Sequence, residues 1–134
     1  TLTAGTLASL AGSSFTGSLG STTVTDQRGG VLGWTTTIAQ TTAFTNGTTT
    51  LPVSSTKAWV AGAIVPSSGT ATVTAGTYLT QPTGLVLSGS AQAFVSATAV
   101  LGNNTTSFNP SIAVTIPSNA TAGSYSGVIT QTVS

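Results

Sequence analysis

The segment GWTTTIAQ, residues 33–40, places Trp34, Thr36 and Ile38 on one face of an extended chain and the intervening residues on the other. Side chains alternate with a period of two along a β-strand, and β-branched residues fit its pleated surface. The segment SIAVTIP, residues 111–117, repeats the same alternation with isoleucine and valine. Both segments therefore predict β-strands that bury one face.

Weaker runs of the same kind fill most of the chain, and no window shows the 3.6-residue period of a helix. Glycine, proline and asparagine separate the runs and predict turns. These turn signals lie at residues 46–47, 66–69, 81–84, 102–104 and 119–123. The pattern predicts an all-β fold, an antiparallel β-sandwich of Ig-like or Greek-key type with about eight or nine short strands. The alternative is a closed barrel.

The length and the lack of a linker predict a single β-sandwich domain over residues 1–134. Only 2% of the residues are charged and the net charge is +1, while 39% are hydrophobic, so burial can drive folding. Two basic residues cannot form the cationic face that nucleic acid requires. They cannot form a polybasic membrane site either, and no apolar run is long enough to span a bilayer. We therefore expect no nucleic-acid partner and no membrane insertion.

The chain contains no cysteine and no methionine, and threonine and serine make up about a third of it. This composition suits a protein that lives outside the cell, although cysteine content alone does not fix the compartment. The first residue is Thr1, which we interpret as the start of a mature chain whose signal peptide has been removed. We expect an extracellular location at the cell surface.

The residue inventory argues against an enzyme. The chain has no histidine and no cysteine, and Asp26 is its only acidic residue. A catalytic triad, a carboxylate pair and a multi-carboxylate metal site therefore cannot be assembled. One remaining chemical alternative is a Ser–Lys dyad of Lys57 with Ser54 or Ser55. The other is an isopeptide bond with Lys57 as the amine, Asp26 as the catalytic acid and an asparagine partner, Asn103, Asn104 or Asn109. We expect no catalytic residues, no cofactor and no metal.

The segment TVTDQRGGVLGW, residues 23–34, holds two of the three charged side chains, Asp26 and Arg28. Residues two apart at a strand end project to the same side, and a guanidinium can bind a carboxylate through two hydrogen bonds. We interpret the pair as a structural staple of a glycine-rich turn that delivers Trp34 to the core. A ligand-contacting role is the alternative for the pair. For Trp34 and Trp59 the alternative is a platform for carbohydrate.

The same segment resembles the WxL-type surface domains of Gram-positive bacteria. The resemblance rests on a D-x-R-G…GW-T run, with Asp26, Arg28, Trp34 and, after a spacer, Phe44, and it continues in order to residue 134. Downstream it includes Gly-Asn-Asn, Phe-Asn-Pro, IAVTIP and the ending SNATAGSYSGVITQTVS. Thr36 stands where the first W-x-L motif has leucine, and the second motif is absent. The resemblance implies a secreted β-domain at the cell surface. Attachment to peptidoglycan is associated with the complete two-motif pattern.

Two non-enzymatic functions follow from these observations. The first is a subunit of a cell-surface filament or surface layer, assembled as a homopolymer by β-strand complementation. Residues 1–17 form a strand-like segment that a neighbouring copy could accept, with Leu2, Leu7 and Leu10 as the buried side chains of the donor strand. The alternatives are pairing of this strand within its own sheet and a monomeric module that binds cell-wall polysaccharide. Four glycosylation sequons, at Asn46, Asn103, Asn104 and Asn119, fall in predicted turns.

Overall fold

The computed structural model describes residues 2–3, 14–60, 64–75 and 84–134. These residues form an all-β fold of two antiparallel sheets, which confirms the predicted β-sandwich class. The strands are β1 (Leu2–Thr3), β2 (Ser14–Ser18), β3 (Thr22–Asp26), β4 (Trp34–Thr45), β5 (Thr56–Val60), β6 (Pro66–Thr74), β7 (Leu85–Val86), β8 (Gln92–Phe108), β9 (Pro110–Thr115) and β10 (Ser126–Val133). One turn of 3-10 helix, η1 (Val53–Ser55), precedes β5.

Hydrogen bonds order the larger sheet β1-β10-β4-β8-β3, with β6 also paired to β8. The smaller sheet has the order β2-β9-β5-β7. Every one of these pairings is antiparallel.

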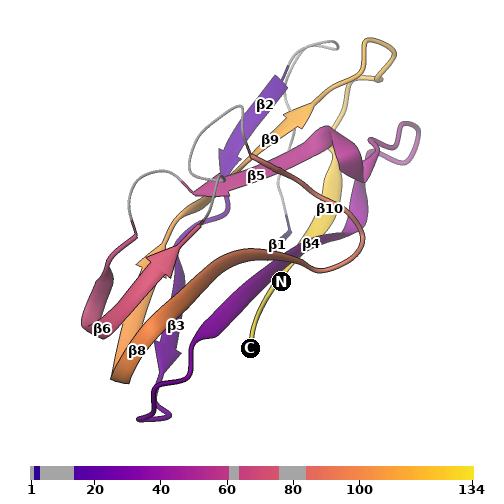
Figure 1. The fold of residues 1–134 in the computed structure, drawn as a ribbon. Coiled ribbons are helices and arrows are strands. Elements are labelled where there is room, and N and C mark those ends of the chain that lie inside the picture. The colour runs from indigo at the N-terminus through magenta and orange to yellow at the C-terminus, as the bar shows by residue number, and fades with distance from the viewer. Residues whose placement is uncertain (1, 4–13, 61–63, 76–83) are drawn as a thin grey trace.

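The long strand β8 bends sharply near its middle, and this bend gives the larger sheet its shape. Ala99 and Gly102 both have positive φ, 50° and 69°. Figure 1 shows β8 running to one end of the molecule and returning, with β6 following it round the bend. β4 pairs with the first half of β8, and β3 pairs with the returning half. The β6–β8 ribbon therefore folds over and joins the two layers of the sandwich.

β2 and β3 follow one another along a single edge. β2 pairs with β9, and β3 pairs with the returning half of β8. Ser18 pairs with Ser111, the Leu19 N–H donates to the Pro110 carbonyl, and Thr22 pairs with Phe108. One layer thus contains β2 and β3 in succession, and the other contains β4 and β10.

Two predicted turns proved to be parts of strands. Residues 66–69 belong to β6, and residues 102–104 belong to β8. The glycines in these segments have the pattern of turn residues, but they lie in the bend of the ribbon, where both strands change direction while remaining paired. The predicted turns at residues 46–47 and 119–123 are present, and residues 81–83 lie outside the described part of the chain.

The core lies between the layers and follows the predicted alternation. Trp34, Thr36 and Ile38 of β4 are all buried, as are Ile112 and Val114 of β9. Their buried neighbours include Phe44, Leu51, Leu87, Phe94, Val95, Val100 and Ile129. Each fully buried large aliphatic or aromatic side chain contributes about 1.5–3 kcal/mol through the hydrophobic effect. This core fixes the position of the polar turn at its edge.

Candidate functional site

The turn after β3 is held by the ion pair between Asp26 and Arg28. Arg28 Nε lies 2.8 Å from Asp26 Oδ1, and Arg28 Nη2 donates to Oδ2 at 2.9 Å. The backbone N–H of Arg28 also donates to Oδ1 at 3.1 Å. Arg28 Nη2 further donates to the carbonyls of Leu32 and Gly33, at 3.2 and 3.0 Å. The guanidinium therefore ties both ends of the turn together.

These contacts determine the electrostatics of the site. Hydrogen bonds from the side chain and the backbone of Arg28 lower the pKa of Asp26 to about 2, from an ordinary value of 3.8. The same pair raises the pKa of Arg28. Both groups therefore remain charged at every physiological pH, and their bonding capacity is directed at each other and at the turn. This geometry is that of a structural staple.

Trp34 begins β4 directly after the stapled turn and is only 3% exposed. Its indole Nε1 donates to Asn104 Oδ1 of β8 at 3.4 Å, across the two layers. Asn104 is itself buried and lies opposite Asp26 in the β3–β8 pairing. The sequence marks Asn104 as a sequon in a predicted turn, whereas its contact with Trp34 depends on tertiary structure.

Thr36, the residue at the leucine position of the W-x-L pattern, has a structural role of its own. Its hydroxyl donates to the carbonyl of Val95 and accepts from the N–H of Val95, both at 3.0 Å. The β4–β8 pairing shifts register between Thr35 and Thr37. At this irregularity the hydroxyl of Thr36 takes the place of the backbone groups that would otherwise bond Val95. A leucine could not make these two bonds.

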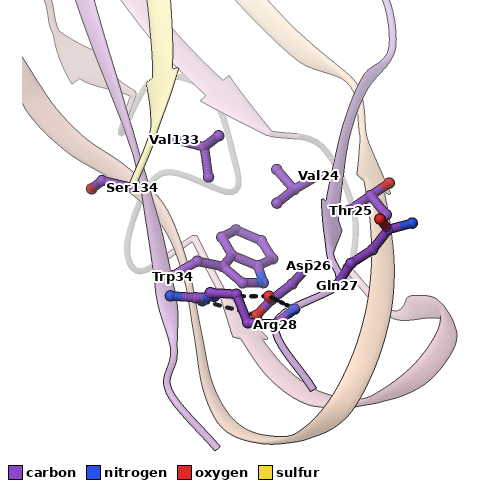
Figure 2. A pocket seen from close by; sticks show the side chains of 8 residues that line it. All are labelled: Val24, Thr25, Asp26, Gln27, Arg28, Trp34, Val133 and Ser134. Carbon is purple, nitrogen blue, oxygen red and sulfur yellow. Dashed lines mark hydrogen bonds and ion pairs between the residues drawn. The ribbon is translucent and has the colours of Figure 1, made fainter. Parts of the chain in front are cut away.

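A hollow of about 470 Å³ opens beside the staple, between β3 and the end of β10. Figure 2 shows Val133 and Val24 facing one another above the Trp34 ring, with Asp26 and Arg28 at the rim. Val24 and Asp26 are two positions apart on β3, so both side chains face the hollow. This alternation can be seen in the sequence. The contribution of Val133 depends on tertiary structure alone.

Lys57 and Asp26, the groups of the alternative chemistry, lie on strands that do not pair with each other. Lys57 of β5 lies opposite Ala113 of β9 and Val86 of β7, whereas Asp26 of β3 lies opposite Asn104 of β8. No group of three or more metal-ligating side chains (His, Cys, Asp or Glu) occurs among residues 2–3, 14–60, 64–75 and 84–134. Within the same ranges, no helix has the length and apolar character needed to cross a bilayer.

The four sequons differ in their surroundings. The amide of Asn46 accepts from the N–H groups of Thr48 and Thr49 and donates to Thr121, so it is used in holding a turn. Asn104 is buried against Trp34. Asn103 and Asn119 are exposed.

Aromatic side chains offer carbohydrate little surface. Trp59 is 8% exposed and alternates with Ala58 and Val60 along β5, so it lies on the opposite face of that strand. Six of the aromatic residues in the described ranges are buried: Trp34, Phe44, Trp59, Phe94, Phe108 and Tyr125. Phe15 is partly buried against the core.

The candidate donor strand is described only at its beginning. Leu2 and Thr3 form β1 and pair antiparallel with Ile129 and Val128 at the outer edge of the larger sheet. Leu7 and Leu10 lie outside the described residues.

Neither the models of known protein families, nor the curated proteins, nor the solved structures contain a match to this chain.

Proposed function

We propose that this protein is a non-enzymatic, extracellular structural protein, a subunit of a cell-surface filament or surface layer. In this proposal the N-terminal strand of one copy completes the larger sheet of the next. The observation that carries the proposal is the position of β1. Among residues 2–3, 14–60, 64–75 and 84–134, β1 is the end strand of the larger sheet, and the pairs Leu2 with Ile129 and Thr3 with Val128 join it to β10.

A strand at a sheet edge can be exchanged at little cost, because the neighbouring copy offers the same partner in the same register. The sequence of residues 1–17 offers Leu2, Leu7 and Leu10 as the apolar side chains that a neighbouring copy would bury. Each exchanged strand links one copy to the next, and a head-to-tail link that does not close gives a fibre.

The composition supports dense packing of copies. With a net charge of +1 and 2% charged residues, neighbouring subunits repel one another very little. The alternative function is that of a wall-binding monomer. Among the described residues, no exposed aromatic side chain offers a platform that would support it.

The test uses a disulfide across the β1–β10 pairing. Thr3→Cys and Val128→Cys together introduce the only thiols, since the natural chain has no cysteine. Strand exchange gives a ladder of covalent oligomers on a non-reducing gel, and electron microscopy of the same sample shows filaments or a lattice. Each single-cysteine variant is the control and gives no ladder. A double variant that forms only intramolecular disulfides, in a sample that stays monomeric at high concentration, contradicts the proposal.

A further inference from the structure

The free edge formed by β2 and β3 is a second place where strands can add. Among the described residues, β2 pairs only with β9 and β3 pairs only with β8, so each has one edge without a strand partner. Natural proteins often protect such edges with lysine, proline, bulges or inward-pointing charged residues. β3 reads Thr-Thr-Val-Thr-Asp, and its one charge, on the buried Asp26, is paired with Arg28. The described edge carries no lysine or proline, and its β-branched residues favour pairing with another strand.

The hollow beside β3 shows what an added strand would cover. Val133 alternates with Ile129 and Gln131 along β10 and so belongs to the inward face, yet it is 50% exposed. It is exposed because the opposite layer ends at β3, whose Val24 faces Val133 across the hollow (Figure 2). Trp34 of β4, the strand next to β10, lines the hollow between them. A strand laid beside β3, about 4.8 Å away, would lie over Val133 and close this apolar opening.

We infer that the occupant of this edge is the same edge of a second copy, paired antiparallel about a two-fold axis near Val24. The axis places Thr23 of each copy opposite Thr25 of the other, and Thr22 opposite Asp26. Threonine pairs suit directly opposed positions on neighbouring strands. Because the carboxylate of Asp26 is bound by Arg28, neither edge presents an unpaired charge to the other. The contact is independent of the exchange of β1, and it would join two filaments or two monomers side by side.

Cysteine pairing tests the register directly. Opposed residues of antiparallel strands have Cα atoms about 4.5–5.5 Å apart, which lies within the range of a disulfide. We expect a full-length Thr23→Cys protein mixed with a Thr25→Cys protein to form a covalent heterodimer under mild oxidation. The matched control mixes Thr70→Cys with Thr72→Cys, two exposed threonines with the same spacing on β6, which also pairs with β8. Absence of the heterodimer, or equal crosslinking in the control mixture, overturns the inference.

The introduction of positive charge on the edge supplies a second readout. Thr23→Lys with Thr25→Lys puts two like-charge pairs across the axis, which should weaken self-association by about tenfold or more in sedimentation velocity. Thr70→Lys with Thr72→Lys adds the same net charge on β6 and should leave association unchanged. An equal effect of both variants, or no effect of the first, contradicts the inference. Loss of the Thr3–Val128 disulfide ladder with retention of the Thr23–Thr25 heterodimer would reject strand exchange alone, and the reverse result would reject the two-fold edge contact alone.

Discussion

At the scale of single residues, the hydroxyl of Thr36 substitutes for a backbone hydrogen-bonding partner. It bonds both the N–H and the carbonyl of Val95, in a position that is 2% exposed. Thr36→Val keeps the shape but leaves two buried backbone groups without partners. We expect it to lower the free energy of unfolding by about 2–6 kcal/mol, since each of the two groups costs about 1–3 kcal/mol. Thr36→Ser keeps the hydroxyl and should cost clearly less. Urea denaturation of the three proteins measures this, and equal stability of the valine and serine variants would show that these bonds contribute nothing.

Asp26 gives the molecule a simple acid response, because it is the only side-chain carboxylate in the chain. Its pKa is about 2 in the folded protein, below the ordinary value of 3.8. The unfolded chain therefore takes up a proton at higher pH than the folded chain does. The stabilisation from this group is fully present above about pH 4 and is lost progressively as the pH falls towards 2. We expect the melting temperature to fall over this window.

The matched variant for the acid response is Asp26→Asn, which keeps the size of the side chain and removes its titration. It should be less stable than the natural protein at pH 6, because Arg28 loses its anionic partner. Its melting temperature should then change little between pH 4 and pH 2. If the asparagine variant shows the same acid loss as the natural protein, Asp26 is not the group responsible.

At the scale of elements, the bend of the β6–β8 ribbon depends on Gly69. Its φ is +75°, and a Cβ there would overlap the backbone carbonyl oxygen of Asn103. Gly20, between β2 and β3, has a similar φ of +83° but nothing within 4 Å of the Cβ position. We expect Gly20→Ala to cost about 1–2 kcal/mol for the left-handed backbone alone. Gly69→Ala should cost at least about 2 kcal/mol more, because the ribbon must also move apart. Thermal or urea unfolding compares the two variants, and equal losses would mean that the close approach is unimportant.

The bend of the β6–β8 ribbon is the part of the fold that the sequence did not predict. The strands around Ile38 and Val114 were predictable because one face is buried and the alternation is local. Gly69 and Gly102 carry a turn signal that is correct for the backbone angle, yet the paired strand continues through both. Whether a glycine ends a strand or bends it depends on the partner strand, which the local sequence does not contain.

In the candidate site, the local contacts were predictable from the sequence and the long-range contacts were not. The contact between Asp26 and Arg28 joins residues two apart, so the spacing alone was sufficient to suggest it. The bonds from Trp34 to Asn104 and from Thr36 to Val95 join residues 70 and 59 positions apart. Such contacts follow from the register of β4 and β3 against β8, and no local pattern encodes them.

At the scale of the whole molecule, the near absence of charge predicts how the protein responds to solution conditions. There is no histidine, there are three charged side chains, and two of them are paired with each other. Screening by salt acts on separated exposed charges, of which this chain has very few. We therefore expect the free energy of unfolding to change by less than about 0.5 kcal/mol between about 0.05 and 1 M sodium chloride, and equally little between about pH 5 and 7.

Assembly of the copies should also respond little to sodium chloride, but it should respond to sulfate. Copies that meet through uncharged strands and apolar surface, such as Val133, are held by backbone hydrogen bonds and burial. Sulfate strengthens burial by being excluded from protein surface, whereas sodium chloride at moderate concentration mainly screens charge. We expect light scattering to show assembly promoted by sulfate and nearly unchanged by equal ionic strength of sodium chloride. Dissolution of the assemblies by moderate sodium chloride would mean that ion pairs hold the copies together, and neither the exchange of β1 nor the pairing of the β3 edges could then be the main contact.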